Sequence, residues 1–131
     1  MRKLIFFLPL IFLFSCSHNT ELKQEVAAAN ELLPKQIGNG IVADSLFLTN
    51  DEVVYQVVVD DSYYYDEDLS VDEQKDRISQ IIKGSWTLDD NKQFKTRIKT
   101  AGMGVRYHIK MKNSDDVFDV VISNDAVDNE M

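Results

Sequence analysis

The chain has 131 residues, with 22 acidic and 14 basic side chains and a net charge of −8 at pH 7. This acidic balance argues against nucleic acid as a partner, because phosphate binding requires clustered basic charge. The sequence contains one cysteine, so an internal disulfide is excluded. The length fits one domain with a modest hydrophobic core.

The first 15 residues have the three parts of a secretory signal peptide. Arg2 and Lys3 supply positive charge, Leu4 to Phe14 are apolar except for Pro9, and Ser15 is small. A membrane-spanning helix needs about 20 apolar residues, which this segment does not offer. The pattern therefore predicts a signal peptide over residues 1–15.

The end of this leader, Leu13-Phe14-Ser15-Cys16, resembles the lipobox of bacterial lipoproteins. In that family the cysteine carries palmitate-like acyl chains and becomes the new amino terminus after cleavage. The resemblance implies lipidation at Cys16, and two or more acyl chains anchor a protein stably to a membrane. We expect a cell-envelope protein, tethered to the outer membrane, with its domain in the periplasm or at the cell surface. The alternative is an ordinary signal peptide with a chance cysteine.

Residues 16–33 are expected to form a partly helical tether between the lipid and the domain. Helix-forming residues run from Glu21 onward, and the proline at position 34 should end the helix. Leu22, Val26, Ala29 and Leu33 recur at helical spacing and form one apolar seam. We expect this seam to dock on the domain; a partner helix is the alternative.

Residues 34–126 are predicted to form a single domain. Alternating apolar residues predict strands over 41–48, 53–59, 105–112 and a return strand with Phe118, Val120 and Ile122 facing inward. The second of these strands should be central, because few of its residues are polar. From Asn124 onward the chain is mostly polar and acidic, and residues 127–131 are expected to form a disordered tail.

Two helices should lie between the two pairs of strands. Ser70 and Glu73 form a capping box for the first helix, which should bury Ile78, Ile81 and Ile82 and end at Gly84. The second helix should begin at Asp89 or Asp90 and run to Gly102. The order β-β-α-α-β-β predicts an α+β fold, with an antiparallel sheet of about four strands packed against a helical layer.

The domain resembles a group of small, uncharacterised lipoproteins of the Bacteroidota type. The resemblance rests on Leu33-Pro34, the strand with Val54-Tyr55, the two central helices and Gly104-Val105-Arg106-Tyr107. It implies an envelope lipoprotein and supplies no catalytic residues.

Motifs for catalysis are missing from the sequence. His108 lies between Arg106 and Lys110, and cationic neighbours disfavour both protonation and metal binding of a histidine. There is no G-x-S-x-G elbow, no glycine-rich phosphate loop and no Cys/His metal spacing. We therefore expect a protein that is not an enzyme and has no cofactor or metal.

The acidic loop Asp60 to Asp68 is the better candidate site. Its partner-binding candidates are Tyr63, Tyr64, Tyr65, Asp66, Glu67 and Asp68. Tyrosine gives much contact area at small entropic cost. In a simpler arrangement, one tyrosine packs inward and two lie on the surface. Calcium is a further alternative, although the glycine and spacing of an EF-hand are missing.

Positive charge is concentrated in residues 91–112, which include the candidate basic patch Arg106, Lys110 and Lys112. We expect these side chains to pair across a hairpin with Asp119 and its neighbours. The alternative is a patch that faces an acidic partner or anionic headgroups.

These features predict a noncatalytic interaction or assembly module, tethered through Cys16 and binding an envelope protein. The alternative function is that of an inhibitor or immunity-type lipoprotein, whose acidic loop blocks a basic toxin or cell-wall hydrolase. The oligomeric state stays open.

Overall fold

The computed structural model describes residues 17–128 of the chain. The predicted signal peptide, Cys16 and the last three residues lie outside the described residues. Within the described range, none of the helices has both the length and the apolar character needed to cross a bilayer.

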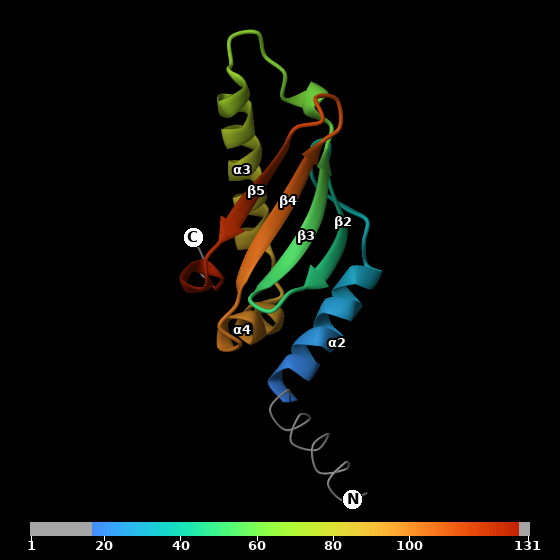
Figure 1. Cartoon of the computed structure of the whole chain (residues 1–131), viewed down its shortest axis with the longest axis vertical. Coiled ribbons are helices and arrows are strands. Elements are labelled where there is room, and N and C mark those ends of the chain that lie inside the picture. Colours follow the sequence, from blue (N-terminus) through green and yellow to red (C-terminus); the bar gives the residue numbers. More distant parts are fainter. Residues whose placement is uncertain (1–16, 129–131) are drawn as a thin grey trace, which may run out of the picture.

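The fold is α+β, as predicted, with helices packed against one sheet (Figure 1). The sheet has five strands instead of the four predicted, because β1 is a strand of only four residues, too short to show an alternating pattern in the sequence. The strands lie in chain order, and every neighbouring pair is antiparallel except β3 and β4, which are parallel. The parallel pair follows from the two helices between these strands, because a crossover returns the chain in the same direction. The strands are β1 (Lys35–Gly38), β2 (Ile41–Leu48), β3 (Glu52–Val59), β4 (Gly104–Met111) and β5 (Val117–Ile122).

Helices α3 (Val71–Leu88) and α4 (Lys92–Thr100) form the crossover. The capping box of Ser70 and Glu73 is present at the start of α3. The predicted end of this helix at Gly84 is wrong, because the helix continues and buries Trp86 in its last turn. The predicted cap of α4 is also corrected: the side chain of Asn91, rather than an aspartate, accepts a hydrogen bond from the Phe94 N–H at 3.1 Å.

The core lies between one face of the sheet and the helices. On β4, the alternating residues Val105, Tyr107, Ile109 and Met111 are all buried, as predicted. They align in register with Val53, Tyr55, Val57 and Val59 of the central strand β3. Ile78 and Ile82 of α3 are fully buried, whereas Ile81 is exposed beside Gly38, at the thin β1 edge of the sheet. None of the described helices covers the opposite face of the sheet, which Figure 1 shows toward the viewer.

Helix α2 (Ser17–Glu31) packs onto the domain through its apolar seam. Leu22 and Val26 are buried, which confirms the predicted docking. The side-chain oxygen of Asn30 accepts a hydrogen bond from the Leu46 N–H at 2.9 Å. The pairing of β2 with β1 ends at Ala43, so β2 has an unpaired edge beyond this residue. The contact with Asn30 occupies part of this edge, which keeps it from pairing with another chain.

The carboxyl-terminal segment packs further than the sequence predicted. Residues Asn124–Ala126 form a 3₁₀ turn, and Val127 is fully buried. The indole N–H of Trp86 donates to the Val127 carbonyl at 2.9 Å. The predicted start of the tail at residue 127 is therefore wrong, because Val127 is anchored in the core.

Candidate functional site

Three connections meet at one end of the molecule, which we call the distal end. They are the β1–β2 turn at Asn39, the segment from Asp60 to Ser70 and the β4–β5 turn that begins at Asn113. Figure 1 shows this end at the top of the view, while α4 and the first turn of α2 lie at the bottom. The acidic loop therefore lies far from the beginning of α2.

The base of the loop is held by its own aspartates. Asp61 accepts a hydrogen bond from the Asn113 N–H at 2.8 Å, and Asp60 accepts one from the Asn113 side-chain amide at 2.9 Å. Hydrogen bonds from Ser62 and Asn113 lower the pKa of Asp60. Burial alone would raise the pKa of Asp61, but the bonds from Asn113 and Ser114 more than offset it and lower that pKa. Both carboxylates are therefore ionised at neutral pH, and their hydrogen bonds hold the acidic loop against the β4–β5 turn.

The three tyrosines divide as the simpler arrangement predicted. Tyr64 is buried, and its hydroxyl donates to the Asn39 carbonyl at 2.6 Å. Tyr63 and Tyr65 are 65% and 69% exposed. The Tyr63 ring lies so close to Gly40 that a side chain at that position would meet it at 2.6 Å. Two aromatic side chains are therefore presented on a base that is fixed to the sheet.

The remaining acids of the loop complete this surface. The Asp66 side chain accepts a hydrogen bond from the Asp68 N–H at 2.9 Å, which shapes the turn. Glu67 and Asp68 are exposed. We call Tyr63, Tyr65, Asp66, Glu67 and Asp68 the distal loop.

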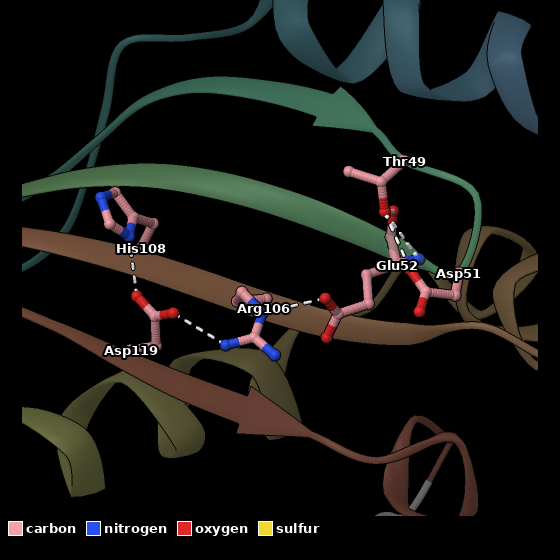
Figure 2. A network of polar contacts seen from close by, with 6 residues as sticks. All are labelled: Thr49, Asp51, Glu52, Arg106, His108 and Asp119. Atoms are coloured by element: carbon pink, nitrogen blue, oxygen red, sulfur yellow. Dashed lines mark hydrogen bonds and ion pairs between the residues drawn. The ribbon is translucent and has the colours of Figure 1, made fainter.

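A second polar cluster lies on the open face of the sheet (Figure 2). The Arg106 guanidinium donates to Glu52 at 2.9 Å and to Asp119 at 2.7 Å. The other Asp119 oxygen lies 2.7 Å from Nδ1 of His108. Thr49 fixes the start of this network, because its hydroxyl accepts from the Glu52 N–H at 3.0 Å. Hydrogen bonds from Arg106 to both carboxylates raise the pKa of the guanidinium further above its ordinary value.

The contacts of Arg106 distinguish between the two arrangements expected for the basic patch. Arg106 pairs across the hairpin with Asp119, as expected, and with Glu52 as well. Lys110 and Lys112 are exposed beside it. Arg106, Lys110 and Lys112 therefore do not form a patch of three uncompensated positive charges, because two carboxylates compensate the charge of Arg106.

Other basic residues of the same segment are also used within the domain. Lys95 is buried, with its ammonium 5.3 Å from the centre of the Trp86 ring. Arg97 pairs with Glu21 and Glu25 of α2, and Lys99 pairs with Asp128 at 3.4 Å. The positive charge concentrated in residues 91–112 therefore helps to hold α2 and the carboxyl-terminal segment against the domain.

Asp119→Asn should make the stability of the protein less dependent on acid pH. Burial alone would raise the pKa of Asp119, but hydrogen bonds from Arg106 and His108 more than offset it and lower the pKa. A lowered pKa stabilises the fold above the unfolded value of about 3.9, and this contribution disappears as the pH falls through the folded value. Urea unfolding between neutral and acid pH measures the effect. Asp44→Asn, at an exposed site on β2, is the control. If the free energy of unfolding of the Asp119 variant changes with pH as steeply as that of the parent, the prediction is contradicted.

Sequence reasoning missed Glu52 and Asn113. Glu52 lies beside Arg106 because β3 and β4 pair in parallel, and this pairing follows from the strand order, which the sequence left open. Asn113 joins the β4–β5 turn to the acidic loop through residues more than 50 positions earlier in the chain, and no local pattern indicates such a contact. Within residues 17–128, no group of three or more His, Cys, Asp or Glu side chains is placed to hold a metal ion.

Comparison with known proteins shows which folds are similar. No family model and no curated protein matches the sequence. Among solved structures, the type 2 secretion system pilotin EpsS of Vibrio vulnificus superimposes with a TM-score of 0.60 at 8% identity, over 88% of this chain and 94% of EpsS. The type II pilotin AspS of Vibrio cholerae gives a TM-score of 0.59 at 11% identity, over 84% of this chain and 92% of AspS.

A candidate secreted protein of Pseudomonas aeruginosa has a similar fold, with a TM-score of 0.55 at 11% identity, over 84% of this chain and 96% of that protein. Two of these three proteins are secretion-system pilotins. At such identities the likeness establishes the fold that they share.

Proposed function

We propose that this chain is a lipid-anchored envelope protein that acts as a noncatalytic assembly module. Its partner is an envelope protein that docks on the distal loop. The observation that carries the proposal is the placement of Tyr63 and Tyr65, which are exposed at the end of the molecule opposite the first turn of α2. The pilotin-like fold supports it, because pilotins of the type II secretion system share this architecture.

The geometry of the anchor and the loop explains why this end suits a partner. Cys16 directly precedes Ser17, where α2 begins. A lipid on Cys16 would hold that end of the domain at the bilayer and direct the distal loop away from it. The partner would therefore meet the tyrosines before any other part of the domain.

The distal loop is also suited to binding in its chemistry. Two rigid aromatic side chains supply contact area, and their base is already ordered by Asp60, Asp61 and Tyr64. Glu67 and Asp68 add exposed negative charge. We expect the complementary surface of the partner to be apolar in its centre and basic at its rim.

Replacing both Tyr63 and Tyr65 with Ser should abolish partner capture and leave the fold intact. Exposed substitutions usually change the free energy of unfolding by less than about 0.5 kcal/mol each, so the melting temperature should shift by only a few degrees. Capture from solubilised envelopes, followed by mass spectrometry, measures binding. Phe47→Ser, at an aromatic residue on the open sheet face that is 41% exposed, is the matched control and should still capture the partner.

Capture that survives in the folded double variant would contradict the proposal. The identity of the captured protein separates the two functions. A membrane-embedded or envelope assembly component supports the assembly module. A secreted basic toxin or a cell-wall hydrolase, inhibited when bound, would show instead that the acidic loop serves an inhibitor.

Cys16→Ala should release the protein from membranes. The prediction follows from the lipobox-like ending at Cys16, the single cysteine of the chain. Two or more acyl chains give stable anchoring, and the variant would carry none. Membrane fractionation with a high-salt wash measures the change. A variant that still sediments with washed membranes would overturn the lipid anchor.

A further inference from the structure

The two edges of the sheet are built differently. β1 has only four residues, and its register with β2 shifts between Gln36 and Gly38. Lys35 and the preceding Pro34 add a charge and a residue that cannot donate a backbone hydrogen bond. Short length, irregular register, Lys and Pro are the features that keep an edge strand from pairing with other chains.

The opposite edge, β5, has none of these features. Its six residues, Val117–Ile122, contain no Lys or Pro, and their register with β4 is regular throughout. Within residues 17–128, no strand pairs with its outer side. The outer side of β5 is therefore an open strand edge.

The outward backbone groups of this edge can be assigned. The Met111 N–H donates to the Asp116 carbonyl at 2.8 Å, which makes these two residues a hydrogen-bonded pair. In an antiparallel ladder, bonded and non-bonded pairs alternate. In the observed register of β4 and β5, Phe118, Val120 and Ile122 are then the residues hydrogen-bonded to β4. Val117, Asp119 and Val121 direct their N–H and C=O groups away from the sheet.

The side chains of the same three residues lie on the open face. Val117 and Val121 are 50% and 45% exposed, on either side of Asp119. The two carboxylate oxygens of Asp119 each accept one bond, from Arg106 and from His108. Each oxygen can accept a second bond, so Asp119 can bind one more donor from a strand added beside it.

We infer that β5 accepts an extended segment of a partner protein as a sixth strand. The segment would carry two apolar residues opposite Val117 and Val121, and a Lys or Arg between them opposite Asp119. Its backbone would pair with the outward groups of these three residues, in the mode known as β-augmentation. This surface is separate from the distal loop, and the inference holds whether or not the tyrosines bind a partner.

A second copy of this chain is a poor occupant of the edge. Two β5 strands paired antiparallel through their outward residues, with Val117 of each strand opposite Val121 of the other, would place the two Asp119 side chains opposite each other. Like charges in directly opposed positions destabilise a sheet. The net charge of −8 on each chain adds to the repulsion. The chemistry of the edge therefore favours a partner with a basic residue at this position.

Amide hydrogen exchange of the full-length protein in mild detergent tests the inference. The probe is the blocked synthetic peptide Ser-Val-Thr-Lys-Thr-Val-Ser, which places Val, Lys and Val on one face of a strand. At saturating peptide, exchange at Val117, Asp119 and Val121 should slow by about tenfold, because these amides become hydrogen-bonded. The same peptide with Glu in place of Lys should protect them much less.

Two controls address the backbone directly. Val121→Pro removes one outward donor and no bond to β4, so it should abolish protection by the peptide, whereas Val121→Thr should retain it. A peptide that is N-methylated at the residues facing β5 should not protect the parent protein, and this arm does not depend on the folding of a variant. The inference is overturned if the peptide leaves the exchange rates of these three amides unchanged, or if the Glu peptide protects them equally well. It is also overturned if the three amides already exchange slowly before peptide is added.

Discussion

Val57→Asp should prevent the protein from folding. Val57 is 1% exposed on β3, the middle strand of the sheet, and it pairs with Ala43 on one side and Ile109 on the other. An unpaired carboxylate at such a site costs several kcal/mol, against a total stability of about 5–15 kcal/mol. The circular dichroism of the purified variant should lack a cooperative thermal transition.

Val58→Asp is the matched control for this experiment. Val58 is the next residue of β3, but it lies on the open face and is 37% exposed. A carboxylate there stays hydrated, so the melting temperature should fall only slightly. A Val57 variant that melts like the parent, or a Val58 variant that is equally damaged, would contradict the assignment of the two faces of the sheet.

Trp86→Ala should produce the second large loss of stability. The Trp86 ring is 3% exposed, lies 6.4 Å from the Tyr55 ring in an edge-on arrangement, and donates its N–H to the Val127 carbonyl. Removal of a buried tryptophan costs about 3–5 kcal/mol. For a domain of this size, the melting temperature should fall by about 10–20 °C.

Two variants separate the parts of this effect. Trp86→Phe keeps an aromatic ring and loses the hydrogen bond to Val127, so its stability should lie between those of the parent and the alanine variant. Leu88→Ala, two residues further along α3 at a side chain that is 80% exposed, should have little effect. A melting temperature of Trp86→Ala within a few degrees of the parent would show that the ring does not close the core.

The strands and their buried faces could be predicted from the sequence because their patterns are local. Alternation along β4 identifies Val105, Tyr107, Ile109 and Met111 as buried, and the structure confirms all four. The capping box at Ser70 is local as well, since its donors and acceptors lie within four residues. Such features depend on neighbouring residues, which the sequence displays directly.

Features that depend on distant residues could not be predicted. Gly84 should have ended a helix by its own preference, but the burial of Trp86 two residues later outweighs the cost of one glycine. The contact of Arg106 with Glu52 follows from the parallel pairing of β3 and β4. Val127 is buried, and its carbonyl accepts a hydrogen bond from Trp86, which lies 41 residues earlier in the sequence.

The candidate site shows the same division. Composition alone indicated the aromatic and acidic loop, and the expected arrangement with one tyrosine inside is correct. Which tyrosine is buried depends on the Asn39 carbonyl, 25 residues earlier, to which Tyr64 donates. The sequence also did not show that the loop lies opposite the first turn of α2, because this placement results from the direction of β3 in the sheet.

Photocrosslinking in intact cells tests the central claim most directly. A photoreactive amino acid at position 65, on the distal loop, should crosslink to one envelope protein, and the adduct should disappear when Tyr63 is also replaced with Ser. The same amino acid at position 23, on the exposed side of α2, is the control and should give no such adduct. An identical adduct from both positions, or none from position 65 while the control crosslinks, would contradict docking at the distal loop.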